Sequence, residues 1–221
     1  MATYLVTGAN RGIGLEYCRQ LKQRGDDVIA VCRSASEELK DLNVAIETDV
    51  DLTSDRDVAR LVEKLDGTTI DVLINNAGIL ERVSLDNLDI ESIRKQFEVN
   101  ALAPLRLTHA LLSNLKSGSK IIIMTSRMGS IEDNTSGGSY GYRMSKVALS
   151  MAGKSLSKDL KSRNIAVAIL HPGLVKTQMT DFNSSGITPE QAVKGLLTRI
   201  EQLNLENTGT FWHSNGEVLP W

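Results

Sequence analysis

A tyrosine and a lysine stand four positions apart, at Tyr142 and Lys146, in a segment of helical period. At this spacing two side chains project from the same face of a helix. An isolated tyrosine has a pKa of about 10 and exchanges protons poorly at neutral pH, but a neighbouring ammonium group stabilises the phenolate and lowers that pKa. The pair therefore indicates proton exchange with an alcohol or a carbonyl. Tyr140 is a weaker candidate, because Met144 stands four positions beyond it.

A serine precedes this pair at the end of an apolar run. Ser126 closes the strand that we expect over residues 120–124. Ser130 and Ser139 are alternatives, but neither stands at the end of a strand. Ser126 is therefore the preferred hydroxyl.

Asn100 lies in a helical run that also contains Pro104. Proline has no N–H, so it cannot bond to the carbonyl four residues back, which belongs to Asn100. The helix is expected to kink there and to leave that carbonyl free to hold a water. A kink without a chemical role is the alternative.

A glycine-rich turn, Thr7–Gly14, separates the first expected strand from the first expected helix. Glycines allow a sharp turn and let backbone N–H groups approach a pyrophosphate at the positive end of a helix. Three residues and then one separate the glycines, unlike the GxGxxG of common dinucleotide-binding enzymes. The turn predicts a phosphate-binding loop.

These residues must be positioned by strands that alternate with helices. We expect strands over 4–6, 28–32, 44–46, 70–74, 120–124 and 165–170, and helices from 13 to near 25, over 54–65, from about 90 to 115, and from near 142 to before 164. The strands are continuously apolar, as in a parallel sheet covered by helices on both faces. The pattern predicts an α/β fold: a single-domain, Rossmann-type doubly wound parallel sheet in three layers over 1–221, with ligands at the carboxyl ends of the strands.

The composition is that of a soluble globular protein, with 41% hydrophobic and 24% charged residues. A formal net charge of −2 argues against a general nucleic-acid binder. No apolar run approaches the roughly 20 residues of a membrane helix, and no secretory signal precedes the first strand. A cytoplasmic protein is expected.

Cysteines and histidines give no sign of a metal site. Cys18 and Cys32 have neither redox nor metal-ligand spacing, so reduced thiols are expected. His109, His171 and His213 are scattered and are expected to be structural.

Together these motifs resemble the short-chain dehydrogenase/reductase family. The glycine turn is similar to TGxxxGxG, and Asn75–Gly78, Asn100, Ser126, the tyrosine–lysine pair and Pro172-Gly173 follow in order over nearly the whole chain. The segment from Tyr142 to Lys146 and the ending from Gly209 to Trp221 resemble most the sniffer/C-factor-like carbonyl reductase branch.

The resemblance implies a catalytic role for four residues. Tyr142 would transfer the proton, Ser126 would hold the substrate oxygen, and Lys146 would bind the nicotinamide ribose and tune the tyrosine. Asn100 would bind a water that connects the lysine to solvent. Sixteen positions separate Ser126 from Tyr142, more than in typical members, so residues 131–139 are expected to carry a small insertion.

The end of the second strand points to NADP(H). An acid there would repel a 2′-phosphate, but the sequence has Arg33 and Ser34 instead. Arg11 can reach the same volume, and basic residues at these two places accompany NADPH in the family. Two solvated surface arginines are the alternative.

The resemblance extends this site along the chain. Asp51 would meet the adenine, with Asp49 as a competitor, and Val175 and Thr177 would hold the carboxamide. The cofactor-binding residues expected are Gly8, Asn10, Arg11, Gly12, Ile13, Gly14, Arg33, Ser34, Asp51, Leu52, Asn76, Ala77, Gly78, Tyr142, Lys146, Pro172, Gly173, Val175 and Thr177.

The resemblance implies an NADPH-dependent reductase of aldehydes, ketones or quinones. The segment 178–188, which would cap the substrate, is short and polar apart from Met179, Phe182 and Ile187, so an open cleft is expected. A nucleotide-sensing signalling protein is the alternative. A homodimer or homotetramer is expected through the tyrosine helix, unless all its apolar surface packs on the sheet. The residues concerned are Val147, Ala148, Met151, Ala152, Leu156 and Leu160.

Overall fold

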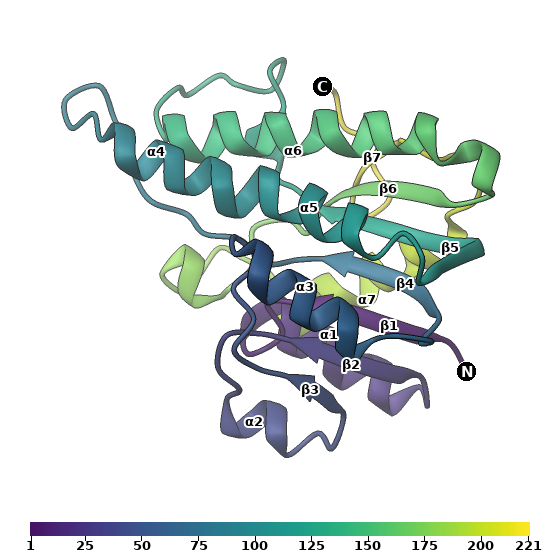
Figure 1. The fold of residues 1–221 in the computed structure, drawn as a ribbon. Helices are drawn as coiled ribbons and strands as arrows, with labels where there is room; N and C mark the ends of the chain where they lie inside the picture. Colours follow the sequence, from purple (N-terminus) through teal and green to yellow (C-terminus); the bar gives the residue numbers. More distant parts are fainter.

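Seven parallel strands form one sheet in the structure, a computed structural model that describes residues 1–221. The strands are β1 Thr3–Thr7, β2 Asp27–Val31, β3 Ala45–Glu47, β4 Ile70–Asn75, β5 Leu115–Met124, β6 Ala166–His171 and β7 Phe211–His213. Their order is β3-β2-β1-β4-β5-β6-β7. The direction of growth reverses between β1 and β4, where an open α/β sheet leaves a crevice for ligands. In Figure 1 the strands run from the N-terminal side toward the left, where their carboxyl ends lie.

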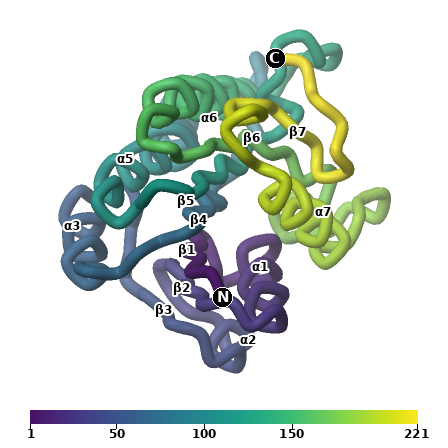
Figure 2. Tube along the Cα trace, turned by 90° about the vertical axis from the view of Figure 1, so that its right-hand side faces the viewer, coloured from purple at the N-terminus to yellow at the C-terminus, as the bar shows by residue number.

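Helices cover both faces of the sheet. They are α1 Gly12–Gln23, α2 Glu37–Lys40, α3 Asp55–Lys64, α4 Ile90–Phe97, α5 Ala103–Ala110, α6 Tyr140–Asp159 and α7 Pro189–Gln202. Figure 2 shows α3, α5 and α6 on one side and α1 and α7 on the other. The predicted Rossmann-type three-layer fold is therefore confirmed.

The sheet separates two apolar cores, because successive strand residues point to opposite faces. Leu5 packs in the same cluster as Leu107 of α5, whereas Val6 packs in the same cluster as Leu21 of α1 and Leu196 of α7. Both positions of each strand must therefore be apolar, which explains the continuous apolar runs of the sequence.

The long helix expected over 90–115 is divided in the structure. A π-helical segment, Glu98–Leu102, joins α4 to α5, so the irregularity expected beside Pro104 is present. The expected end at residue 115 was wrong. The helix ends at Ala110, and Leu115 begins β5 by pairing with Ile70, before a register shift in that pairing.

Three elements were missed by the sequence reasoning: α2, α7 and β7. Helix α7 had a readable start, because Thr188 and Gln191 form a reciprocal capping box with Pro189 at the first helical position. Strand β7 has three residues, too few to show a pattern, and it exists through its pairing with β6.

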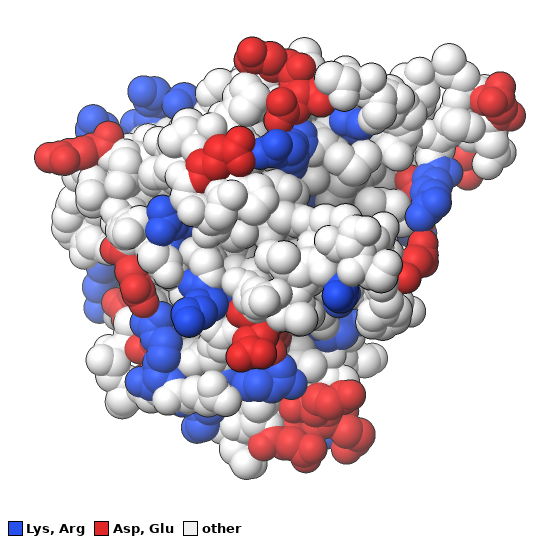
Figure 3. Space-filling model, turned by 180° about the vertical axis from the view of Figure 1, so that it is seen from behind, with Lys and Arg blue, Asp and Glu red and all other residues white.

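The surface and the helices give two further facts. On the face opposite to that of Figure 1, basic and acidic side chains are interspersed (Figure 3). None of the helices combines the length and the apolar character that crossing a membrane would require.

Candidate active site

A cavity of about 740 Å³ opens at the carboxyl ends of the strands. Sixteen of the expected site residues line it, namely Gly8, Asn10, Arg11, Gly12, Ile13, Gly14, Arg33, Asp51, Leu52, Asn76, Ala77, Gly78, Tyr142, Lys146, Pro172 and Thr177. Most residues expected in the site therefore lie on the wall of one cavity. The loops after several strands and helix α6 contribute them.

The turn between β1 and α1 is packed too tightly for side chains. Gly8 has φ of +65°, and a Cβ there would lie 2.9 Å from the Cα of Ala77. A Cβ on Gly14 would lie 2.1 Å from the carbonyl oxygen of Gly8. Only glycine fits at either position, so the backbone of the loop lies bare along the cavity beside the N-terminus of α1.

Thr7 and Asn76 fix this turn to the end of β4. The Thr7 hydroxyl accepts hydrogen bonds from the backbone N–H groups of Asn76 (2.9 Å) and Ala77 (3.0 Å). The Asn76 amide donates to the carbonyl of Thr7 at 2.9 Å. Thr7 is thus a positioning residue that the list of expected site residues lacked, although it opens the glycine motif.

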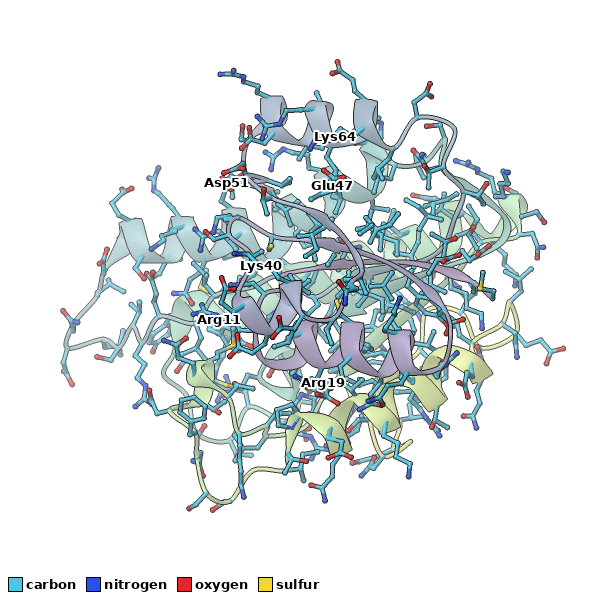
Figure 4. The ribbon with its side chains drawn as sticks, turned by 90° about the horizontal axis from the view of Figure 1, so that it is seen from below. Arg11, Arg19, Lys40, Glu47, Asp51 and Lys64 are labelled. Carbon is cyan, nitrogen blue, oxygen red and sulfur yellow. The ribbon has the colours of Figure 1, made fainter.

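A second, smaller cavity adjoins the turn and has a basic lining. It measures about 380 Å³ and is lined only by Asn10, Arg11, Arg33 and Ser34. Arg33 makes no side-chain hydrogen bond or ion pair, whereas Arg11 donates a hydrogen bond to the Gln178 side chain. Figure 4 shows Arg11 beside the start of α1. Two guanidinium groups around a polar pocket are suited to bind a phosphate.

Asp51, rather than Asp49, lines the main cavity. Its carboxylate accepts hydrogen bonds from the Thr53 backbone N–H (2.9 Å) and hydroxyl (2.7 Å). These two bonds, and then the charge of Arg33, lower the pKa of the carboxyl group, while its partial burial acts in the opposite direction. Asp51 is therefore an oriented acceptor on the wall, close to the basic pocket.

Tyr142 and Lys146 lie on the first turns of α6 and are both buried. The Lys146 ammonium is 5.7 Å from the centre of the Tyr142 ring and donates a 2.9 Å hydrogen bond to the carbonyl of Met124, the last residue of β5. A Cβ on Gly78 would lie 3.5 Å from that ammonium. The lysine is thus held between the ends of β4 and β5 on one face of α6.

Burial dominates the electrostatics of the pair. It raises the pKa of Tyr142 to about 12, and a hydrogen bond with Ser126 acts in the opposite direction. Burial also lowers the pKa of Lys146 to about 8. The expectation that the lysine lowers the tyrosine pKa below its usual value is not met, because burial of Tyr142 raises that pKa. Tyr142 is protonated at neutral pH.

Ser126 is the serine that meets the tyrosine. Its side chain opposes the rise of the Tyr142 pKa, and its hydroxyl accepts a hydrogen bond from the backbone N–H of Met128 at 3.2 Å. The hydroxyl of Ser130 is instead occupied by the Asp133 N–H, and Ser139 caps the start of α6 with a left-handed backbone. The longer separation from Tyr142 is taken up by the loop over residues 131–139.

Asn100 is fully buried within the π-helical segment. Its amide donates to the carbonyl of Ile79 (2.9 Å) and to the hydroxyl of Ser145 (3.0 Å), and its oxygen accepts from the Ile79 N–H (2.8 Å). The side chain therefore ties the loop after β4 to α6. Ser145, which links Asn100 to the tyrosine helix, was not among the expected residues.

Five expected site residues do not line the main cavity: Ser34, Asn100, Ser126, Gly173 and Val175. Ser34 lines only the smaller basic cavity. Wall residues that the sequence reasoning did not assign to the site include Cys32, Thr53, Ile79, Val99, Lys176, Gln178, Met179 and Phe182. Met179 and Phe182 had been noted only as apolar residues of the capping segment.

The histidines that end β6 and β7 lie outside the cavity wall. The rings of His171 and His213 meet edge to face with centres 4.9 Å apart. Burial, followed by the proximity of His213 and Arg127, lowers the pKa of His171 to about 3. No three His, Cys, Asp or Glu side chains are grouped so that they could hold a metal ion.

Comparison with known sequences agrees with this arrangement. The profile of the short chain dehydrogenase family matches residues 2–187. The 1-hydroxy-2-glutathionyl-2-methyl-3-butene dehydrogenase of Rhodococcus sp. is 44% identical over 228 aligned positions, which cover all of both chains. The C-signal protein of Myxococcus xanthus is 43% identical over 155 positions, which cover 69% of this chain and 93% of that protein.

Solved structures resemble the whole chain. The NADPH-bound carbonyl reductase from chicken fatty liver has a TM-score of 0.91 at 30% identity and matches 100% of this chain and 99% of that chain. The carbonyl reductase Sniffer of Drosophila melanogaster has a TM-score of 0.92 at 31% identity, with both chains fully covered. The resemblance to the sniffer-like branch is therefore found in sequence and in fold.

Proposed function

The chain belongs to the short-chain dehydrogenase family of oxidoreductases, and on this premise we propose that it is an NADPH-dependent carbonyl reductase. The observation that carries the proposal is the position of a buried Tyr142, whose pKa is influenced by the Ser126 side chain, in a cavity that continues into a pocket with two arginines. The substrates proposed are aldehydes, ketones or quinones.

Tyr142 acts as the proton donor to the carbonyl oxygen. With a pKa raised to about 12 by burial, it keeps its proton throughout the neutral range and can release it to a developing alkoxide. Ser126 shares the hydroxyl network of Tyr142 and holds the substrate oxygen beside it. NADPH, when bound, supplies the hydride. Fixed donors that face the oxygen as it gains charge stabilise the transition state.

Lys146 and Asn100 support the tyrosine. Lys146 presents its ammonium close to Gly78 and the end of β5, where it binds the nicotinamide ribose. Asn100 holds the loop after β4 against α6 through Ile79 and Ser145. Its main-chain carbonyl would bind the water that connects the lysine to solvent. The proton transfer thus depends more on the fixed position of Tyr142 relative to the substrate than on a lowered tyrosine pKa.

The residues present fit a dinucleotide with a 2′-phosphate. The glycine turn leaves a cradle that any Cβ would fill, and Arg33 has no partner in the protein. Asp51 faces the main cavity as a hydrogen-bond acceptor for the adenosine. The similar chicken carbonyl reductase is NADPH-bound, which supports the same cofactor here.

Alcohol oxidation is a second candidate for the direction of the reaction. It is favoured by the 44% identity to a dehydrogenase whose name specifies a hydroxy compound with a glutathionyl group. Oxidation needs the phenolate form of Tyr142, so its rate would rise with pH toward the raised pKa of about 12. The exposed side chains of Met179 and Phe182 offer apolar surface to a large substituent at an open mouth.

A signalling role is a candidate of another class, supported by the similarity to the C-signal protein. The tyrosine, lysine and serine of the site are all in place, which favours catalysis. A signalling protein that only senses the nucleotide would bind NADPH without turning over any carbonyl.

Self-association through α6 is also part of the proposal. Met151 is 65% exposed on this helix, and Leu102 and Leu105 are exposed on the neighbouring π-helical segment and α5. Leu160, by contrast, is buried in the core and is not available for a contact between subunits. Light scattering of the wild type and of Met151→Glu tests the assembly, because the variant would be monomeric.

NADPH oxidation against a panel of aldehydes, ketones and quinones tests the reductase, with NADH in parallel. Turnover that prefers NADPH and collapses in Tyr142→Phe is expected. Binding of NADPH without turnover of any carbonyl, or of any alcohol with NADP⁺, would favour the signalling role. A preference for NADH would refute the roles of Arg11 and Arg33 while leaving the proton donor in place.

A further inference from the structure

Five residues after β6 are tied to two other loops of the cavity. This segment, residues 178–182, is called the strap. At one end Gln178 accepts a hydrogen bond from Nη1 of Arg11, in the glycine turn. At the other end Asp181 forms a 3.0 Å ion pair with Arg82, in the loop after β4. Gln178, Met179 and Phe182 line the cavity between these ties.

The position of Gln178 relative to the glycine turn is set by the backbone before it. The Thr180 hydroxyl donates to the carbonyl of Val175 and accepts from the N–H of Thr177 at 3.2 Å, which closes a short turn. The methyl group of Thr177 lies 3.4 Å from where a Cβ of Gly12 would stand. Gln178 is thus placed beside Arg11 by packing rather than by its own flexible side chain.

Arg11 differs from other arginines around the cavity in the charge of its partner. Arg19 pairs with Glu16 and Arg82 pairs with Asp181, so a carboxylate offsets each of these charges. The partner of Arg11 is a neutral amide. Its positive charge therefore remains uncompensated by that contact, at the wall of the basic pocket that it shares with Arg33.

One hydrogen bond leaves most of the guanidinium available. Arginine has five N–H donors, and the bond to Gln178 uses one of them. A long, exposed side chain loses conformational entropy when it binds a phosphate, and an existing hydrogen bond reduces that loss. A neutral acceptor can therefore orient Arg11 without competing for its charge.

We infer that Gln178 is a positioning residue for recognition of the 2′-phosphate: it orients Arg11 and so sets part of the preference for NADPH over NADH. The inference rests on the proposed function, because it requires the phosphate to bind in the pocket lined by Arg11 and Arg33. It also joins cofactor selection to the strap that carries Met179 and Phe182 at the substrate side of the cavity.

Titration of NADPH and NADH by nicotinamide fluorescence tests the inference without any turnover. In Gln178→Met, which keeps the length of the side chain and removes the acceptor, the Kd for NADPH is expected to rise about three- to tenfold, as for one lost orienting hydrogen bond. The Kd for NADH is expected to stay unchanged. Asp181→Asn is the matched control, because it breaks the other tie of the strap and leaves the ratio of the two constants unaltered.

A double-mutant cycle decides whether Gln178 acts through Arg11. In an Arg11→Met background, Gln178→Met should have no further effect on NADPH binding. Equal losses for NADPH and NADH, or a loss that persists without Arg11, would overturn the inference and leave the proposed function intact. A wild type that binds both nucleotides equally would instead refute the proposed NADPH preference itself.

Discussion

The two walls of the cavity are built by different means. The cofactor wall, residues 7–14 with 75–78, is backbone packed on backbone, with Gly8 against Ala77 and Gly14 against Gly8. The substrate wall, formed by the strap over residues 178–182, is tied to neighbouring loops by side chains, with Gln178 bonded to Arg11 and Asp181 paired with Arg82. The first kind of contact allows almost no change of residue. The second can be exchanged for other pairs without moving the chain.

The two kinds of contact also differ in strength. A Cβ added at Gly8 or Gly14 would stand closer than van der Waals distance to the backbone, and this clash cannot relax without moving a whole loop. The ion pair of Arg82 with Asp181 has both side chains 80% exposed, so its contribution to stability is less than about 1 kcal/mol. Substitutions should therefore be far more harmful on the cofactor wall than on the substrate wall.

The largest effect is expected for Gly14→Ala. Its methyl group would stand 2.1 Å from the Gly8 carbonyl, so the turn must deform and the dinucleotide should no longer bind. Fluorescence titration with NADPH measures the loss, and circular dichroism shows whether the fold remains. Gly67→Ala is the control: Gly67 has a positive φ, unlike Gly14, but no atom lies within 4 Å of the added Cβ, so only about 1–2 kcal/mol of unfolding free energy should be lost. If Gly14→Ala bound NADPH as tightly as the wild type, the cofactor wall would tolerate substitution, and the proposed difference between the two walls would be wrong.

Tyr142→Phe should have the next largest effect, because Tyr142 stands where the two walls meet. Loss of the proton donor is expected to lower kcat about 10²- to 10⁴-fold. The Kd for NADPH should not change, since the cofactor wall is untouched. Tyr140→Phe, two residues earlier at the start of the same helix, is the matched control and should keep nearly full activity. A tyrosine variant that lost nucleotide binding instead of turnover would indicate that the walls are not independent.

The sequence revealed the cofactor wall better than the substrate wall for the same physical reason. Gly8 and Gly14 must be glycine because an added Cβ would overlap the backbone, and Gly12 favours glycine because of its positive φ, so the constraint is visible within one short segment. Arg82 and Asp181 are 99 positions apart in the chain, and the sequence around either residue does not predict its contact with the other. The basic pocket was predictable because Arg11 and Arg33 both follow strand ends, but the bond from Arg11 to Gln178 was not.

Among the catalytic residues, too, local features were predictable from the sequence and features that depend on tertiary packing were not. The spacing of Tyr142 and Lys146 on a helix was readable, because helical periodicity is local. The rise of the tyrosine pKa to about 12 was not, since it follows from burial by segments that are distant in sequence. Likewise, Pro104 signalled an irregular helix, but the hydrogen bonds of Asn100 to Ile79 and Ser145 depend on tertiary packing.

A pH effect of intermediate size is expected on the substrate side, at the end of β6. Burial there lowers the pKa of His171 to about 3, and its Nδ1 has no hydrogen-bond partner. The unfolded chain takes up a proton on this residue below about pH 6.5, which the folded chain resists. Stability should therefore be lost as the pH falls from that value toward 3, by up to about 1.4 kcal/mol for each pH unit.

Urea unfolding at a series of pH values compares wild type with His171→Gln, which cannot take up this proton. The variant should show a shallower loss of stability in acid, whereas His109→Gln, on α5 away from this histidine pair, should follow the wild type. Parallel curves for all three proteins would show that His171 is protonated in the folded state. The substrate side would then be better hydrated than its packing indicates.

The smallest effect is expected for Asp181→Asn, which removes a weak interaction of the substrate wall. The ion pair with Arg82 spans two loops of the substrate wall, but solvent surrounds both groups and screens their attraction. Unfolding free energy should fall by less than about 1 kcal/mol, and KM for a bulky carbonyl should rise no more than about fivefold, with kcat unchanged. Raising the ionic strength should bring wild type and variant together, because salt weakens the same interaction in the wild type. An effect on kcat as large as that of Tyr142→Phe would mean that the strap is held as rigidly as the glycine turn, and that the contrast between the two walls does not hold.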